Sequence, residues 1–278
     1  MFKHHKHDSL LVLITFAQVG LLILPFVTEV SLLGLGALVL LNVFLIGTNY
    51  QCVAHNFIHN PFFKSSGLNR GFSLINTLGI GLPQSLYRIH HIEHHRHNNN
   101  PEKDESSTFF HGKLGQEENI FSYSFLGVLR TDLVTLYKQA RNKSILVNLE
   151  IIFFLAFLSL LAQLNWKLTL GYVITSYVLG QVFALWENYC EHHYADYTDR
   201  KRDSVSCYNS VYNLIWFNNG YHQEHHFAPQ IHWTMVPQVT EKLPEDRIIV
   251  RFCHLTNSFN KYQGLRKKPL KVILHIVK

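Results

Sequence analysis

Long hydrophobic runs dominate the pattern of apolar and polar positions along the chain. Residues 10–28 carry no charged side chain, and after Glu29 the run 30–54 is again uncharged. A second pair of runs follows at residues 145–166, which contain a single glutamate, and at 168–186, which contain no charge. A hydrocarbon core of about 30 Å needs roughly 20 helical residues, so each run is long enough to cross a bilayer. The pattern predicts four membrane-spanning helices arranged as two hairpins.

A fifth uncharged stretch, residues 71–87, is shorter and is interrupted by residues that weaken a helix interior. These are Gly71, Gly79, Gly81 and Pro83. We interpret the stretch as an interfacial or re-entrant segment rather than a fifth span. The expected fold is therefore a single all-α integral membrane domain over residues 1–278, in which polar segments 64–144 and 187–278 form a helical cap.

The basic residues are distributed unevenly between the two predicted sides of the membrane. Of the 25 Lys and Arg residues, all but Lys167 lie before the first span, between the two hairpins or after the last span. By the positive-inside rule, both termini and the cap are cytoplasmic. The chain has only 19 Asp and Glu residues, but its basic residues form no single recognition stripe. Binding to an anionic lipid surface therefore explains the excess of basic residues better than binding to nucleic acid does.

Histidine is unusually abundant, with 19 residues, and it is clustered on the predicted cytoplasmic side. The second span runs into His55 and His59, which lie one helical turn apart if the helix continues. Two later clusters share the pattern H-x-E-H-H, whose histidines share a helical face at i, i+3 and i+4. They comprise His91, His94 and His95 in the first, and His222, His225 and His226 in the second.

Neutral imidazoles in repeated trios indicate metal ligation, because a basic patch would use lysine and arginine. A further segment, at the cytoplasmic end of the last span, places Asn188 and His192 one turn apart, so that it adds a ninth imidazole and an amide that can hold a water. Nine imidazoles exceed the needs of one tetrahedral zinc and suit two metals with four or five nitrogen ligands each. Iron is the redox metal expected there.

A glutamate immediately precedes one proposed ligand in each of three clusters, at Glu93, Glu191 and Glu224. Such a carboxylate can accept the second ring proton of a ligand and so fix its tautomer. The alternative is that these glutamates face solvent or pair with Arg88 or Arg96, since adjacent residues on a helix do not face each other.

Other histidines are expected to stay outside the ligand sets. His90 and His97 do not share the helical face of His91 and His95 in the second cluster. His193 is excluded because His192, and not His193, lies one helical turn from Asn188. Six more have no partner at useful spacing, and no function is assigned to His4, His5, His7, His111, His254 or His275.

These motifs together resemble the membrane fatty-acid desaturase and hydroxylase superfamily. The matching residues are His55-x-x-x-His59, His91-x-x-His94-His95 and His222-x-x-His225-His226. The segment Asn188-Tyr-Cys-Glu-His192 is similar to the N-Y-x-E-H segment of bacterial alkane monooxygenases, whereas the sequence from Gly220 to Pro237 resembles the third histidine box of desaturases. The two similarities agree on metal and fold and differ on whether the product is a double bond or an alcohol.

The resemblance implies a centre of two iron ions that uses O₂ to attack a C–H bond of a lipid acyl chain. Desaturation is the favoured outcome, and hydroxylation of a fatty acid or alkane is the alternative. The chain contains no electron-carrying motif, so the donor is expected to be a separate protein: a ferredoxin, a rubredoxin or a cytochrome with its reductase.

Two other functions fit the sequence less well than the oxidoreductase. An intramembrane zinc hydrolase would need H-E-x-x-H, which the sequence lacks. A non-enzymatic metal transporter would place ionisable ligands near the bilayer midplane, but the four predicted spans contain no histidine. Both hypotheses are therefore less favoured than the oxidoreductase.

The one-turn spacing of Asn188 and His192 makes a direct prediction. His192→Ala is expected to abolish lipid product while the protein stays in the membrane, because it removes a metal ligand. His193→Ala is expected to be mild, since its side chain leaves the helix about 100° away. Lipid mass spectrometry of cells expressing each variant checks this, and an active His192→Ala beside an inactive His193→Ala would refute the assignment.

Overall fold

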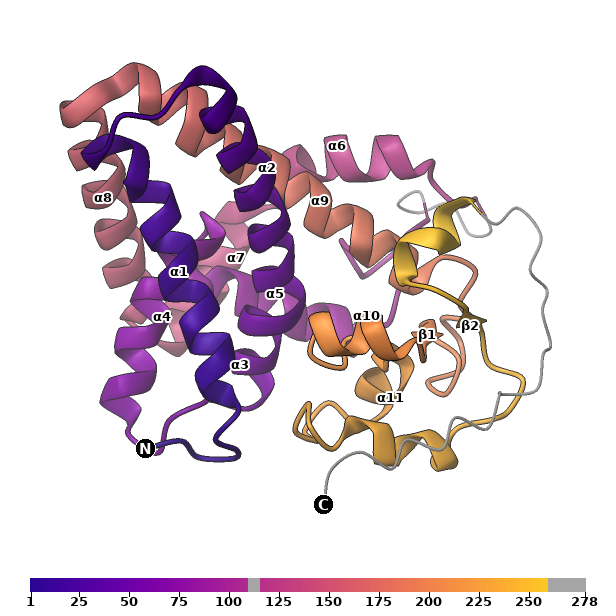
Figure 1. Cartoon of the computed structure of the whole chain (residues 1–278). Helices are drawn as coiled ribbons and strands as arrows, with labels where there is room; N and C mark the ends of the chain where they lie inside the picture. The colour runs from indigo at the N-terminus through magenta and orange to yellow at the C-terminus, as the bar shows by residue number, and fades with distance from the viewer. Residues whose placement is uncertain (110–115, 260–278) are drawn as a thin grey trace.

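Long apolar helices form one side of the protein in the computed structural model (Figure 1), which describes residues 1–109 and 116–259. Within those residues, three helices are long and apolar enough to cross a membrane. They are α1 (Asp8–Val27), the helix Leu32–His59 and the helix Leu146–His192. The second contains α2 (Leu32–Thr48), a π-helical turn (Asn49–Ala54) and α3 (His55–His59); the third contains α8 (Leu146–Leu168), a π-helical turn (Thr169–Ile174) and α9 (Thr175–His192).

The third helix is 47 residues long and is broken at Asn165. Asn165 has extended backbone angles (φ −160°, ψ 96°), and its Oδ1 accepts a hydrogen bond from the backbone N–H of Leu168. An asparagine that satisfies a free N–H in this way is a typical start of a helix. The long helix is therefore two arms, α8 and α9, which correspond to the third and fourth hydrophobic runs of the sequence.

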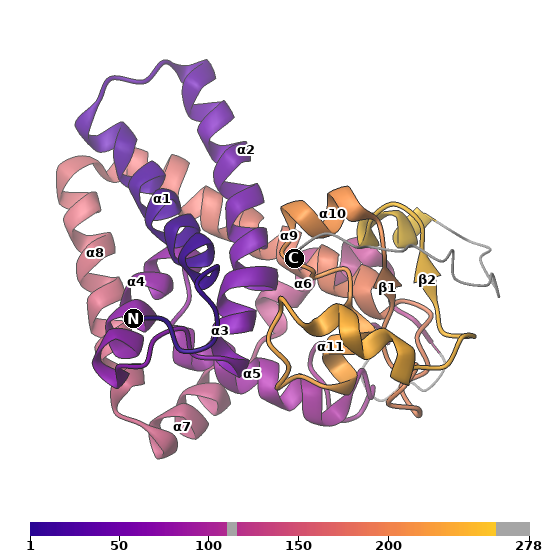
Figure 2. The ribbon, with the colours of Figure 1, turned by 60° about the horizontal axis from the view of Figure 1, so that its bottom comes forward.

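Shorter elements complete the fold, which is mostly helical (Figure 2). The two strands pair in parallel over two residues each. In chain order these elements are α4 (Ser66–Ile80), α5 (Gln84–His97), α6 (Ile120–Arg130), α7 (Leu133–Lys143), β1 (Ser206–Cys207), α10 (Ser210–Ile215), α11 (His222–Phe227), a 3₁₀ helix (Val236–Lys242), β2 (Ile249–Val250) and a 3₁₀ helix (His254–Phe259).

The uncharged stretch 71–87 covers the end of α4, a turn and the start of α5. The turn is made at Gly81, whose φ of +70° is the left-handed conformation that favours glycine. Both helices on either side of the turn are too short or too polar to be among the three helices that can cross a membrane. The stretch is therefore not a fifth span, as the sequence indicated.

The long helices expose apolar side chains and bury polar ones. Leu32 and Leu40 are 86% and 72% exposed, whereas Thr15 and Gln18 of α1 are fully buried. This inversion suits a protein surrounded by lipid, where apolar surface costs nothing and polar groups must find partners inside. The chain is accordingly membrane-associated.

A buried polar network joins α1, the first π-helical turn and α4. The Asn49 amide donates to Gln18 Oε1 and to Asn76 Oδ1, each at 2.9 Å. Asn76 also accepts from Thr15 Oγ1 at 2.8 Å and donates to Gln84 Oε1, the first residue of α5, at 2.8 Å. Because unmet hydrogen-bonding groups are costly in lipid, these contacts fix the π-helical turn that leads to His55 against the start of α5, which carries His91.

Glycines allow α2 and α9 to approach closely. A Cβ atom added to Gly180 would lie 2.5 Å from Ile46 Cβ, and one added to Gly47 would lie 2.3 Å from the Phe183 ring. Small residues at a helix–helix contact are typical of packing in membranes. This contact sets the distance between the helix that carries His55 and the helix that carries His192.

Gly180→Ala is expected to destabilise the protein, because its methyl group would meet the branched, buried Ile46 side chain. Overpacking of this kind costs about 1–3 kcal/mol. Gly20→Ala is the matched control. Outside its own helical turn, no atom of the described residues lies within 4 Å of its added Cβ, and alanine favours a helix by roughly 0.5–1 kcal/mol. Thermal unfolding in detergent should show a lower Tm for Gly180→Ala only; equal Tm values would contradict the close α2–α9 contact.

Candidate metal centre

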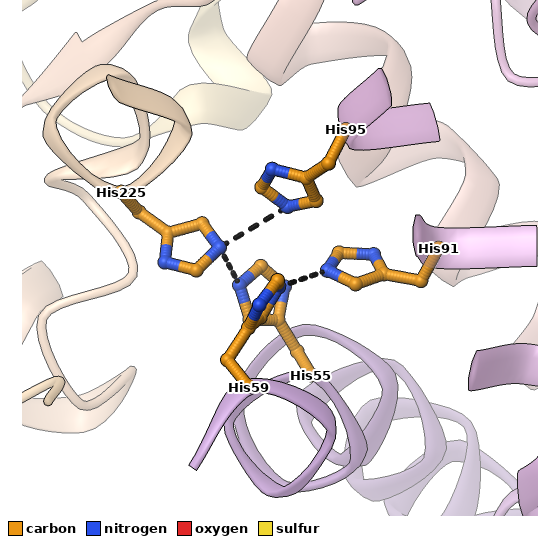
Figure 3. Close-up of side chains that lie close together, drawn as sticks. All are labelled: His55, His59, His91, His95 and His225. Carbon is orange, nitrogen blue, oxygen red and sulfur yellow. Dashed lines mark hydrogen bonds between the residues drawn. The ribbon is translucent and has the colours of Figure 1, made fainter. Parts of the chain in front are cut away.

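Five histidines from three helical segments converge in a first group (Figure 3). Their nearest ring nitrogens all lie within 4.8 Å of one another. The His55 and His225 Nε2 atoms are 2.7 Å apart, those of His59 and His91 are 2.9 Å apart, and those of His225 and His95 are 3.2 Å apart. The group therefore presents five nitrogen atoms to one small volume.

A second group comprises His94, His192 and His226, whose ring nitrogens also lie within 4.8 Å of one another. The Nε2 atoms of His94 and His192 are 3.0 Å apart. His222 adjoins this group, with its Nε2 atom 3.2 Å from His192 Nε2. All nine imidazoles singled out in the sequence are thus brought together, five in one group and four in or beside the other.

Helix geometry divides each histidine cluster between the two groups. On α5, His91 and His95 are one turn apart and enter the first group, whereas His94 enters the second. On α11, neighbouring His225 and His226 point to different groups. Residues at i and i+4 share a helical face and adjacent residues do not, so the H-x-x-H-H spacing serves two sites at once.

Groups around the histidines orient their rings. Asp104 Oδ2 lies 2.7 Å from His94 Nδ1, and the backbone carbonyl of Asp203 lies 3.0 Å from His192 Nδ1. Such partners bind the outer ring proton and turn the other nitrogen inward. No sequence motif points to Asp104, because it lies in a loop ten residues beyond His94.

Within the two histidine groups and His222, several buried ring nitrogens have no hydrogen-bond partner among the described residues. They are His95 Nδ1, His222 Nδ1 and both ring nitrogens of His226. Unpaired buried polar atoms are rare in native structures, and at the Nε2 position of His226 a cation would supply the missing partner. The dense nitrogen donors and the orphaned atoms both fit two metal ions.

Burial lowers the pKa of most imidazoles at this site, and their neighbours lower it further. His94 is the exception, because the adjacent Asp104 carboxylate outweighs the effect of burial and raises its pKa. For His91 and His95 of α5, and for His222, His225 and His226, the pKa falls well below its ordinary value. These rings are consequently neutral near pH 7. The neutral imidazole is the form that binds a metal.

The three glutamates and Asn188 lie in different surroundings. Glu93 accepts hydrogen bonds from Arg96 at 2.6 and 2.8 Å, which is the alternative pairing weighed above. Glu224 accepts hydrogen bonds from Ser206, Tyr208 and Thr240. Glu191 lies 3.6 Å from His222 Nε2, and Asn188 donates to the Tyr123 hydroxyl at 2.7 Å.

The histidines expected outside the ligand sets have other partners. His90 lies 2.8 Å from Ser106 Oγ, His97 lies 3.4 Å from Glu93, and His193 lies 3.0 Å from Glu117. His111 and His275 lie outside the described residues.

His254 was assigned no function from the sequence, and this interpretation needs correction. Its ring is fully buried between Glu187 and Glu191, 3.7 and 3.4 Å from their carboxylate oxygens. Burial acts to lower the pKa of His254, but the two carboxylates outweigh it and raise the pKa to about 9. No local spacing could reveal this group, because its members come from segments more than sixty residues apart.

A cavity reaches both histidine groups. Its polar lining includes His55 and His91 of the first group, His94 of the second, and His222 and Asn188, with further polar side chains such as Gln51 and Thr131. Apolar side chains also line it, among them Leu82, Val128, Leu136 and Leu185. Such a cavity suits an apolar chain that passes close to metal ions.

The family is decided by comparison with known proteins. The model of the family described as fatty acid desaturase matches residues 30–248 of the 278. The chain belongs to the fatty acid desaturase family. The resemblance drawn from the histidine motifs is therefore confirmed, and all nine clustered histidines of this desaturase-family chain lie within the matched range.

Characterised relatives are distant. A protein from Oryza sativa named sphingolipid delta(4)-desaturase DES1-like is 24% identical over 222 residues, which cover 71% of this chain and 60% of the relative. The Gallus gallus sphingolipid delta(4)-desaturase DES1 is 29% identical (66% and 58% covered), and the Mus musculus sphingolipid delta(4)-desaturase/C4-monooxygenase DES2 is 28% identical (69% and 60% covered). This desaturase-family chain spans about three fifths of the length of the curated relatives it matches.

Asp104→Asn is expected to weaken metal binding, because it replaces the charged acceptor that orients His94. Loss of such a partner typically lowers metal affinity by about 10–100-fold. Glu105→Gln is the matched control on the same loop, since Glu105 is exposed and lies 3.6 Å from His90, outside both groups. Chelator competition against the iron-loaded proteins measures the difference; an Asp104→Asn variant that holds iron like the wild type would contradict the role of Asp104.

Proposed function

We propose that this protein is a membrane-bound, O₂-dependent di-iron oxidoreductase that acts on a C–H bond of a lipid chain, and that it is a desaturase. The observation that carries the proposal is the cavity, which places an apolar wall beside both histidine groups. An unactivated C–H bond requires a strong oxidant, and a chain held beside two redox metals meets this requirement.

Nine imidazoles would hold the iron ions. His55, His59, His91, His95 and His225 form the first position, and His94, His192, His222 and His226 form the second. Asn188 faces the same cavity and is suited to hold a water near the second position. Bound there, two iron ions would supply the reaction with O₂ that removes hydrogen from the lipid chain.

The protein's own residues place the chain and keep water out. Leu82, Val128 and Leu185 offer apolar contact along the cavity. The Tyr87 hydroxyl donates to the backbone carbonyl of Tyr50 at 3.1 Å, so this polar group of the cavity wall is satisfied internally. A dry, rigid wall limits the positions of the chain relative to the metals, and that position decides which hydrogen is removed.

The membrane arrangement follows from the helices. We infer four crossings, because the long third helix is broken at Asn165, near the end of α8, and the parts before and after the break can each form one arm of a hairpin. The single domain would then place both termini, the cap and the active site on the cytoplasmic side. All of the 25 Lys and Arg residues except Lys167 would lie on that side. That side is accessible to a separate electron-donor protein, such as a ferredoxin, a rubredoxin or a cytochrome.

Hydroxylation is the second candidate outcome. The name of the mouse relative includes both desaturase and C4-monooxygenase, so two outcomes occur among proteins similar to this one. The relatives' names also make sphingolipids the first lipid class to test. A metal transporter is less favoured, because the histidines surround a cavity suited to a lipid chain.

Expression of the wild type beside His225→Ala tests the proposal. His225 bridges two neighbours of the first group, within 2.7 Å of His55 and 3.2 Å of His95, so its loss should abolish product. His94→Ala should do the same, and His5→Ala, which changes a histidine outside both groups, should leave the product unchanged. Mass spectrometry of the host lipids provides the measurement.

A product that lacks two hydrogens and occurs with the wild type only would identify a desaturase, and a product that gains one oxygen would identify a hydroxylase. Product formed by His225→Ala at the wild-type level, with equal amounts of protein in the membrane, would contradict the proposed metal centre.

A further inference from the structure

A third buried cluster adjoins the second histidine group. Glu187, Glu191 and His254 are each fully buried, and one ligand atom from each lies within 4.8 Å of the others. Glu187 and Glu191 lie one turn apart on α9, immediately before His192, and His254 comes from the last 3₁₀ helix. None of the three residues is among the nine histidines assigned to the metals.

The two oxygens of Glu191 have different surroundings. Oε1 accepts a hydrogen bond from the Asn219 amide at 2.6 Å and lies 3.4 Å from His254 Nδ1. Oε2 has no hydrogen-bond partner within residues 1–109 and 116–259, and it lies 3.6 Å from His222 Nε2. That ring nitrogen is in turn 3.2 Å from His192 Nε2, so the unpartnered oxygen is directed at the second histidine group.

The two metal positions are unequally supplied with nitrogen. Five imidazoles surround the first, whereas three converge on the second and His222 lies at its edge. A buried carboxylate oxygen without a partner is costly, and a metal ion is a partner that would satisfy it. Carboxylate oxygen is also an ordinary ligand of iron beside imidazole nitrogen.

We propose that Glu191 supplies a carboxylate oxygen to the second metal position, and that His254 and Asn219 hold this carboxylate in place. The inference rests on the proposed di-iron function and adds an oxygen donor to a site otherwise made of imidazoles. The negative charge makes the second position electronically different from the first.

The rest of the cluster is built to keep His254 in place. Its Nε2 atom lies 3.0 Å from the backbone carbonyl of Val205, and its Nδ1 atom lies 3.1 Å from the Tyr212 hydroxyl. Tyr212 also donates a short hydrogen bond to Glu187. His254 is thus a positioning residue, which ties the C-terminal part of the described chain to α9 next to the metals.

The test is iron content and the Mössbauer spectrum of purified, iron-loaded variants in detergent. Glu191→Gln keeps the acceptor for Asn219 but loses the anionic oxygen, so iron should fall from about two per chain to about one, with loss of one spectral component. His254→Gln should lower the occupancy of that same component. Glu93→Gln is the matched control: it too precedes a proposed ligand, but it contacts Arg96, and it should keep both irons.

Two irons with an unchanged spectrum in Glu191→Gln would overturn the role of Glu191. If Glu191→Gln does not purify intact, His254→Gln decides the matter: an unchanged spectrum there overturns the proposal, and selective loss of one component supports it. Wild-type protein without iron would instead refute the proposed function, so the two failures are distinguishable.

Discussion

The convergence of neutral imidazoles in a buried space is the constraint on which the rest of this structure depends. Nitrogen atoms from separate helices approach to 2.7 Å, for His55 and His225, with few protons available to link them. Such a cluster gains little from hydrogen bonding alone and is stable when cations occupy its centre. The surrounding fold must therefore bring rigid elements together and hold them against a cost that the bound metals offset.

Helical geometry meets this requirement in two ways. The one-turn periodicity of α5 sends His91 and His95 to one group and His94 to the other, so a single helix serves both metal positions. The contact between Gly180 and Ile46 then sets the distance between the helices that lead to His55 and His192, and the polar network around Asn49 fixes the approach of α5. The distances between the histidines can change only if one of these buried contacts is broken.

The sequence predicted what depends on periodicity and motif spacing. The four hydrophobic runs and the nine clustered histidines follow from local patterns. The structure places the histidines in helices and the runs in helices apart from a few end residues and the break at Asn165. Features that depend on tertiary structure were missed. Asp104 and His254 reach the site from segments that carry no motif. The three Glu-His-His sequences that begin at Glu93, Glu191 and Glu224 are identical, yet only Glu191 lies close to a proposed ligand in space. Burial alone does not separate the three, because Glu224 is as buried as Glu191. The difference lies in their partners, which are Arg96 for Glu93 and Ser206, Tyr208 and Thr240 for Glu224.

The most direct test of the two-position metal centre is a calorimetric titration with ferrous iron under anaerobic conditions. The sample is purified wild-type protein from which a chelator has removed the metal. The account predicts that binding saturates at about two equivalents per chain, because two separate histidine groups are present. Saturation at one equivalent, or no tight binding of iron by a correctly folded protein, would contradict it.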